Sequence, residues 1–99
     1  MSNYYNIDGT VCEGGVMEWA KKFDYRDSRV IGKTDVGDMR VSTVFLGLDH
    51  NYNNEGPPLI FETMIFGGLL DQETWHYSTK EEAEVGHEAA VAIAKKASE

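Results

Sequence analysis

Several features that would assign a chain of 99 residues to a particular class of protein are missing from this sequence. It has a single cysteine, Cys12, which cannot form an internal disulfide, so a reducing, cytoplasmic compartment fits best. No apolar run approaches the ~18 residues of a membrane-spanning helix. The N-terminus, MSNYYNIDGT, lacks the basic start and apolar core of a secretion signal. We therefore expect a cytoplasmic protein that does not enter a membrane.

Basic residues are also scarce: nine Lys and Arg stand against 17 Asp and Glu, which gives a net charge of -8. Affinity for a phosphate backbone comes from clustered Lys and Arg, so direct binding to nucleic acid is disfavoured. An acidic surface can instead attract basic grooves on other proteins. The alternative is that the acidic surface has no partner and only keeps the protein soluble.

Motifs that carry chemistry are absent too, since there is no HExxH, no paired cysteine and no glycine-rich phosphate loop with its lysine. Asp49-His50, Glu62, His76 and His87 could in principle meet as a metal site, or as a base with its orienting carboxylate. None of their spacings is diagnostic, and Asp49-His50 more often marks a strand end. We expect no metal, no cofactor and no catalysis. A small metal-dependent enzyme using Asp49, His50 and Glu62 is kept as an alternative.

What the sequence does contain is a regular pattern of secondary structure within one domain, residues 1–99. Residues 4–12 are expected to be extended, with a turn at Asp8-Gly9. Apolar residues spaced i, i+3, i+4 and i+7 predict a short helix over 16–23. Strands are predicted at 29–34, near 40–49, at 59–66 and at 74–77.

The clearest element is a helix over 78–97. Ser78 with Glu81, or Thr79 with Glu82, makes a capping box at its start. One stripe of this helix is made mostly of small residues, so the helix can lie close to a sheet: Ala83, His87, Ala90, Val91 and Ala94. Short turns between neighbouring strands make the sheet antiparallel. The prediction is an α+β fold, a small antiparallel sheet of about four strands with a short N-terminal and a long C-terminal helix on one face.

The segment from Val41 to Gly68, VSTVFLGLDHNYNNEGPPLIFETMIFGG, predicts a hairpin whose strands are apolar at nearly every residue. Such strands must be covered on both faces, whereas the helices cover only one. The other face therefore predicts self-association. The alternative is that loops and the N-terminal segment wrap over it. The residues predicted for the interface are Val44, Phe45, Leu46, Leu48, Ile60, Phe61, Met64 and Phe66.

Glu62 interrupts the second apolar strand, and a carboxylate in such surroundings is costly to bury unless it is paired. Arg40, Lys33 and His76 are the candidate partners. A buried pair that fixes the strand register is one interpretation, and a ligand-binding or catalytic carboxylate with a raised pKa is another. Exposure at a sheet edge is the third.

The basic residues that do occur are concentrated in one stretch, at Arg26, Arg29, Lys33 and Arg40. They could hold a phosphate or a nucleotide-like anion. The alternative is that they neutralise the adjacent acids, which are Asp24, Asp27, Asp35 and Asp38.

The segments LGLDHN, GPPLIFETM and EEAEVGH, within a stretch from about Trp19 to His87, resemble a family of small proteins found in phages, prophages and bacterial genomes. The resemblance implies a phage-encoded accessory protein in the cytoplasm of a bacterial host. Small acidic phage proteins often act by binding a host protein, and inhibitors of CRISPR and other defence systems are among them.

The leading hypothesis is thus a non-enzymatic interaction protein that self-associates and binds or inhibits a host protein. A second hypothesis is an oligomeric binder that sequesters a nucleotide-like anionic ligand between protomers. The small metal-dependent enzyme is the third.

Overall fold

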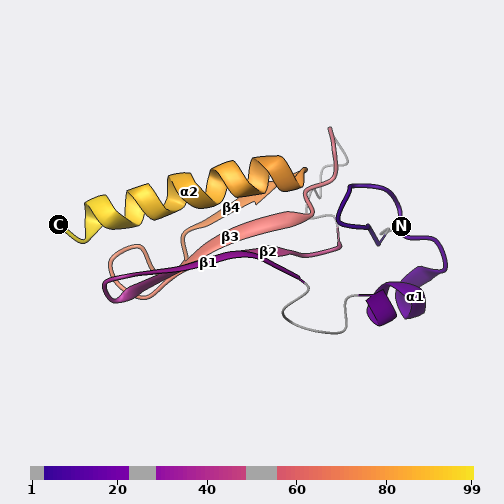
Figure 1. Ribbon diagram of the computed structural model, residues 1–99, viewed down its shortest axis with the longest axis horizontal. Helices are drawn as coiled ribbons and strands as arrows, with labels where there is room; N and C mark the ends of the chain where they lie inside the picture. The colour runs from indigo at the N-terminus through magenta and orange to yellow at the C-terminus, as the bar shows by residue number, and fades with distance from the viewer. Residues whose placement is uncertain (1–3, 23–28, 49–55) are drawn as a thin grey trace.

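A computed structural model gives the fold of residues 4–22, 29–48 and 56–99. The elements follow the order α1 (Gly15–Lys22), β1 (Val30–Val36), β2 (Met39–Phe45), β3 (Phe61–Phe66), β4 (Thr74–Tyr77) and α2 (Lys80–Ala97). The four strands form one sheet in the order β1-β2-β3-β4, and each neighbouring pair is antiparallel. Helix α2 runs along one face of the sheet, whereas α1 lies past its end (Figure 1). The predicted α+β fold is confirmed.

The hairpin strands are shorter than predicted at the end that joins residues 46–60. β2 ends at Phe45 because Gly47 takes a positive φ of 78° and the Trp19 ring packs directly against it. The chain stays close to its neighbour, since the N–H of Leu46 donates to the carbonyl of Ile60 (2.7 Å). At the opposite end, Gly37 and Asp38 form the turn between paired Val36 and Met39.

The N-terminal segment is not a strand of the sheet. It forms two isolated bridges, Tyr4 with Leu48 and Tyr5 with Val11. The predicted turn at Asp8-Gly9 is present: the N–H of Asn6 donates to the carbonyl of Thr10 (2.8 Å), and Gly9 has a φ of 92°. The prediction of extended structure across 4–12 is therefore reduced to these two bridges.

The register of β2 and β3 separates the two faces of the sheet. Val41 pairs with Ile65, Thr43 with Thr63, and Phe45 with Phe61, and all six side chains are buried. Side chains alternate between faces along a strand, so these six share the face that α2 covers. The rings of Phe45 and Phe61 lie 5.3 Å apart and fill one end of the core.

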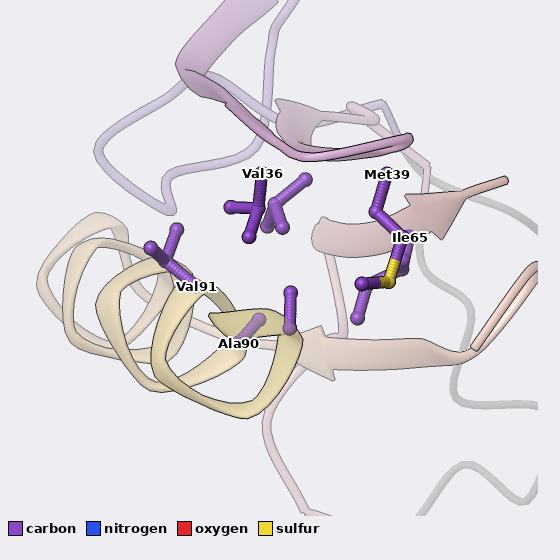
Figure 2. Packing of buried hydrophobic residues seen from close by; sticks show 7 residues of the cluster. Val36, Met39, Ile65, Ala90 and Val91 are labelled. Atoms are coloured by element: carbon purple, nitrogen blue, oxygen red, sulfur yellow. The ribbon is translucent and has the colours of Figure 1, made fainter. Parts of the chain in front are cut away.

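Helix α2 contacts all four strands through its small-residue stripe. Figure 2 shows Ala90 and Val91 facing Val36, Met39 and Ile65 across the interior. The helix begins at the predicted capping box, in which Thr79 accepts from the N–H of Glu82 (3.1 Å) and Glu82 accepts from the N–H of Thr79 (3.1 Å). The spacing between helix and sheet is thus set mainly by alanine side chains.

A substitution at Gly86 tests how closely α2 packs against β4. A helical Gly→Ala change at an unobstructed site should stabilise by about 1 kcal/mol. A Cβ at Gly86, however, would collide with the Tyr77 ring. We expect Gly86→Ala to lower the free energy of unfolding by about 1–3 kcal/mol, as overpacking does. Urea denaturation measures it, and the reverse change at an exposed site, Ala92→Gly, calibrates the propensity cost. A gain in stability for Gly86→Ala would contradict the close contact.

Candidate functional site

The face of the sheet turned away from α2, here called the outer face, carries most of the residues that the sequence singles out. Strand alternation and the register place eleven side chains on it. They are Val30, Lys33, Asp35, Arg40, Ser42, Val44, Glu62, Met64, Phe66, Thr74 and His76. In Figure 1 no described element packs over the middle of this face. The outer face mixes four apolar side chains with seven polar or charged ones.

Glu62 and His76 form a hydrogen-bonded pair on the outer face. They are cross-strand neighbours on β3 and β4, and His76 Nε2 lies 2.9 Å from Glu62 Oε2. Their side chains are 20% and 31% exposed, with Glu62 the less exposed, so Glu62 is half-buried and not the fully buried carboxylate that we predicted. The hydrogen bond satisfies the carboxylate, which favours the interpretation in which this pair fixes the strand register. Of the three candidate partners, His76 is the one the structure pairs with Glu62.

The four basic residues predicted to hold an anion do not gather. Arg29 lies over the Trp19 ring, with its guanidinium carbon 4.7 Å from the ring centroid. Arg40 Nε contacts Asp35 Oδ1 at 2.9 Å, an exposed pair of the kind that contributes less than about 1 kcal/mol. Arg26 lies outside the described residues. Of the three that the structure describes, Lys33 and Arg40 share a surface.

That surface is an open groove of about 760 Å³ at the β1–β2 turn end of the outer face. Lys33 and Arg40 line it together with Asp35, Asp38 and Phe66. Two acids balance the two bases, so the groove has no net positive charge to attract an anion. The nucleotide hypothesis consequently loses the concentrated positive charge on which it depended.

Three of the residues predicted for an interface belong to the core. Phe45, Ile60 and Phe61 are no more than 1% exposed. Phe45 and Phe61 point toward α2, and Ile60, which precedes β3, joins the same buried cluster. These three are corrected to interior residues, because a side chain enclosed by its own chain has no surface to offer. The remaining five are Val44, Leu46, Leu48, Met64 and Phe66, of which Phe66 is the most exposed, at 46%.

The N-terminal segment packs at one end of the hairpin, where Tyr5 and Ile7 lie against the inner cluster that contains Phe45 and Phe61. The N–H of Tyr5 donates to the carbonyl of Gly47 (2.8 Å), and Trp19 Nε1–H donates to the carbonyl of Tyr5 (3.1 Å). Tyr4 stacks at 5.3 Å from Trp19. The described N-terminal residues therefore pack at the hairpin end and against the inner cluster, and they do not support wrapping over Val44, Met64 and Phe66 on the outer face.

A second polar cluster lies on the inner side of the sheet. His87 of α2 hydrogen-bonds two threonines there, and a third threonine bonds one of these two. His87 Nδ1 lies 2.7 Å from Thr43 Oγ1, and Nε2 lies 2.9 Å from Thr34 Oγ1. Thr43 also bonds Thr63 (2.6 Å). Each hydroxyl both donates and accepts, so the network is satisfied with either neutral tautomer of the imidazole. Gly32 lies against the ring, where a Cβ would come within 3.0 Å.

The arrangement suits structure better than catalysis. The imidazole is 6% exposed, and its bonds are to hydroxyls, without the carboxylate that orients a general base. Sequence reasoning placed His87 on the inward stripe but missed its partners. The available signal was Thr43 and Thr63, polar residues at inward positions of two apolar strands.

Metal chemistry finds no support in the described ranges, where no group of three or more His, Cys, Asp or Glu side chains is placed to hold an ion. Asp49 and His50, two of the residues named for the alternative enzyme, lie outside those ranges. No helix in the described part of the chain combines the length and apolar character needed to span a membrane.

Comparisons with models of protein families, with curated proteins and with solved structures found no match.

Burial lowers the pKa of His87 below its ordinary value, with nearby Glu88 acting weakly in the opposite direction. The folded state therefore binds fewer protons than the unfolded state just below pH 6.5, so stability falls as the pH drops through that value. The slope from one group cannot exceed about 1.4 kcal/mol per pH unit.

We expect His87→Gln to flatten the fall in unfolding free energy between neutral pH and pH ~5.5, close to the ordinary histidine value of ~6.5. Urea denaturation at several pH values measures this fall. His76→Gln serves as the matched control and should leave the contribution of His87 in place. An unchanged pH dependence in His87→Gln would contradict the assignment.

Proposed function

We propose that this chain is a small acidic interaction protein without catalytic activity, which self-associates through its outer face and binds a host protein through its acidic surface. The single observation that carries the proposal is the outer face itself. A whole side of the sheet bears Val44, Met64 and Phe66, and the described elements leave its middle accessible.

The charge on the outer face supports self-association there. Lys33 and Arg40 oppose Asp35 and Glu62, and His76 bonds Glu62, so the face is close to neutral in a chain of net charge -8. Two copies would repel each other less strongly through this face than through the acidic remainder of the surface. Interfaces of this mixed composition are common, since a typical interface is about as apolar as the rest of the surface.

The second part of the proposal follows from the excess of acids elsewhere. An acidic surface steers a protein toward basic partners and away from nucleic acid. The segments LGLDHN, GPPLIFETM and EEAEVGH support a phage-encoded protein acting in the bacterial cytoplasm. A host defence protein with a basic groove, such as one that itself binds nucleic acid, is the kind of target this chemistry fits.

Self-association should be sensitive to Met64, at the centre of the outer face. Met64→Glu places a charge between Ser42 and Thr74, two residues from Glu62. We expect it to weaken self-association by about tenfold or more, as central interface residues do. Light scattering during size-exclusion chromatography at micromolar concentrations measures the oligomeric state, and circular dichroism verifies folding.

The matched control is Leu69→Glu. Leu69 is 90% exposed but lies in the β3–β4 turn, off the outer face, so its replacement should leave the oligomeric state unchanged. A wild-type protein that stays monomeric at micromolar concentrations would refute self-association. Equal effects of the two variants would refute the choice of face.

The alternative of an anion-binding oligomer has weaker support, because the groove that holds Lys33 and Arg40 also holds Asp35 and Asp38. We expect nucleotides to leave the melting temperature unchanged. A specific ligand at 100-fold its dissociation constant would stabilise the fold by about 2.7 kcal/mol. A reproducible shift with one nucleotide, lost in Arg40→Gln, would instead support this alternative.

A further inference from the structure

An apolar pocket lies between α2 and β4, at the opposite edge of the sheet from β1. Its volume is about 180 Å³, below the ~300–1,000 Å³ typical of small-molecule sites, so it suits a single inserted side chain better than a whole ligand. Residues from both elements line it: Trp75, Tyr77, Gly86, Ala89, Ala90 and Ile93. We call this surface the β4–α2 groove.

The two flanks of α2 differ in chemistry. Glu82, Gly86, Ala89 and Ile93 follow the i, i+4, i+7, i+11 spacing of one helix flank, and the last three line the β4–α2 groove. The opposite flank faces β1 and presents acids, with Glu84 and Glu88 beside the edge strand. One flank is thus charged over its sheet edge, whereas the other leaves small side chains and an exposed isoleucine over the other edge.

β4 itself is an edge strand with hydrogen-bonding capacity on its outer side. It is last in the sheet order and pairs with β3 alone among the described strands. The carbonyls of Glu73 and Tyr77 accept from Ile65 and Ile60 at 3.0 Å, so these residues bond inward. Backbone groups alternate along a strand, which directs the N–H and C=O of Thr74 toward the open edge. Such an edge is a template for an added strand.

We propose that the β4–α2 groove binds an extended segment of a basic partner protein, which adds to β4 as a fifth strand and inserts an apolar side chain beside Ile93. The proposal rests on the proposed function as an interaction protein and specifies how the partner is recognised. Main-chain hydrogen bonds to an edge strand give such complexes affinity, and pockets for alternate side chains give them specificity.

The charges around the groove identify the occupant. Glu73 immediately precedes β4 and Glu82 lies on the groove-side flank of α2, so an acid stands near each end, and Lys96 follows on the same flank in the last turn of the helix. A second copy of a chain with net charge -8 would be repelled here, in contrast to the near-neutral outer face. An apolar residue flanked by Lys or Arg satisfies both the pocket and its rim.

The test uses a capped peptide of alternating lysine and valine residues, with a peptide of alternating lysine and serine as the charge control. Backbone amide chemical shifts, measured by NMR on the full chain, should change for residues 74–77 and 86–93 with the first peptide. The lysine–serine peptide should cause much smaller changes, because it lacks the apolar side chain. An equal response to both peptides, or no response to either, overturns the proposal.

Two variants of α2 sharpen the test. Ala89→Lys places a long side chain in the groove, whereas Ala92→Lys adds the same charge at an exposed position that does not line it. We expect Ala89→Lys to weaken peptide binding by about tenfold or more, with little effect of Ala92→Lys. Equal weakening by both variants means that binding is merely electrostatic, which overturns the groove.

Self-association provides the readout that separates this proposal from the preceding one. Ala89→Lys should leave the oligomeric state of the protein unchanged, because the outer face lies on the other side of the sheet. Conversion of an oligomer to a monomer by Ala89→Lys would show that a second copy occupies the groove, and would refute the foreign strand. A monomeric wild type that still binds the lysine–valine peptide would refute the outer-face interface and leave the groove standing.

Discussion

The close contact between α2 and the sheet is the constraint on which the rest of this structure depends. The inward stripe of the helix is alanine except for Val91 and His87, so the helix backbone can lie close to the strands. His87 is the polar residue of that stripe. The sheet accommodates it because Gly32 lies against the imidazole ring and a threonine hydroxyl bonds each ring nitrogen. A polar side chain in a tightly packed layer is tolerated only when its hydrogen bonds are complete. In the described part of the chain, no buried side-chain nitrogen or oxygen lacks a partner.

One helix can cover only one face of a sheet. At 18 residues α2 is about 27 Å long, and it contacts all four strands. It does not cover the outer face or the two edges of the sheet. The outer face is dominated by polar residues and paired charges, and the β1 edge lies beside Glu84 and Glu88. The β4 edge lacks such protection on its helix side. Its contrast with the β1 edge follows from the sequence of α2, in which acids recur on one flank and small residues on the other.

The sequence carries the elements and the fold class but only part of the site. The capping box at Thr79, the inward stripe of α2 and the strand at Thr74–Tyr77 are local patterns, and the structure contains each of them. The faces of β2 and β3 were harder to assign, because strands that are apolar at nearly every residue provide no alternation to sort. Phe45 and Phe61 were consequently expected at an interface and are found in the core. Thr43 and Thr63, paired across the strands, held the missing information, since a polar residue in a buried row needs a polar neighbour.

Contacts between distant segments account for the remaining differences. Arg29 was grouped with Lys33 and Arg40 by proximity in sequence, but its guanidinium lies over Trp19, which is itself anchored to the Tyr5 carbonyl. Glu62 could be expected to have a partner from desolvation alone, yet the choice of His76 required the β3–β4 register. Once these pairings are in place, the few bases near the sheet are used to neutralise acids on the outer face, so the uncompensated acids lie elsewhere on the chain. The distribution of charge therefore separates two kinds of surface: a near-neutral outer face, and a β4 edge whose apolar pocket has an acid near each end, which is the surface proposed for a basic strand.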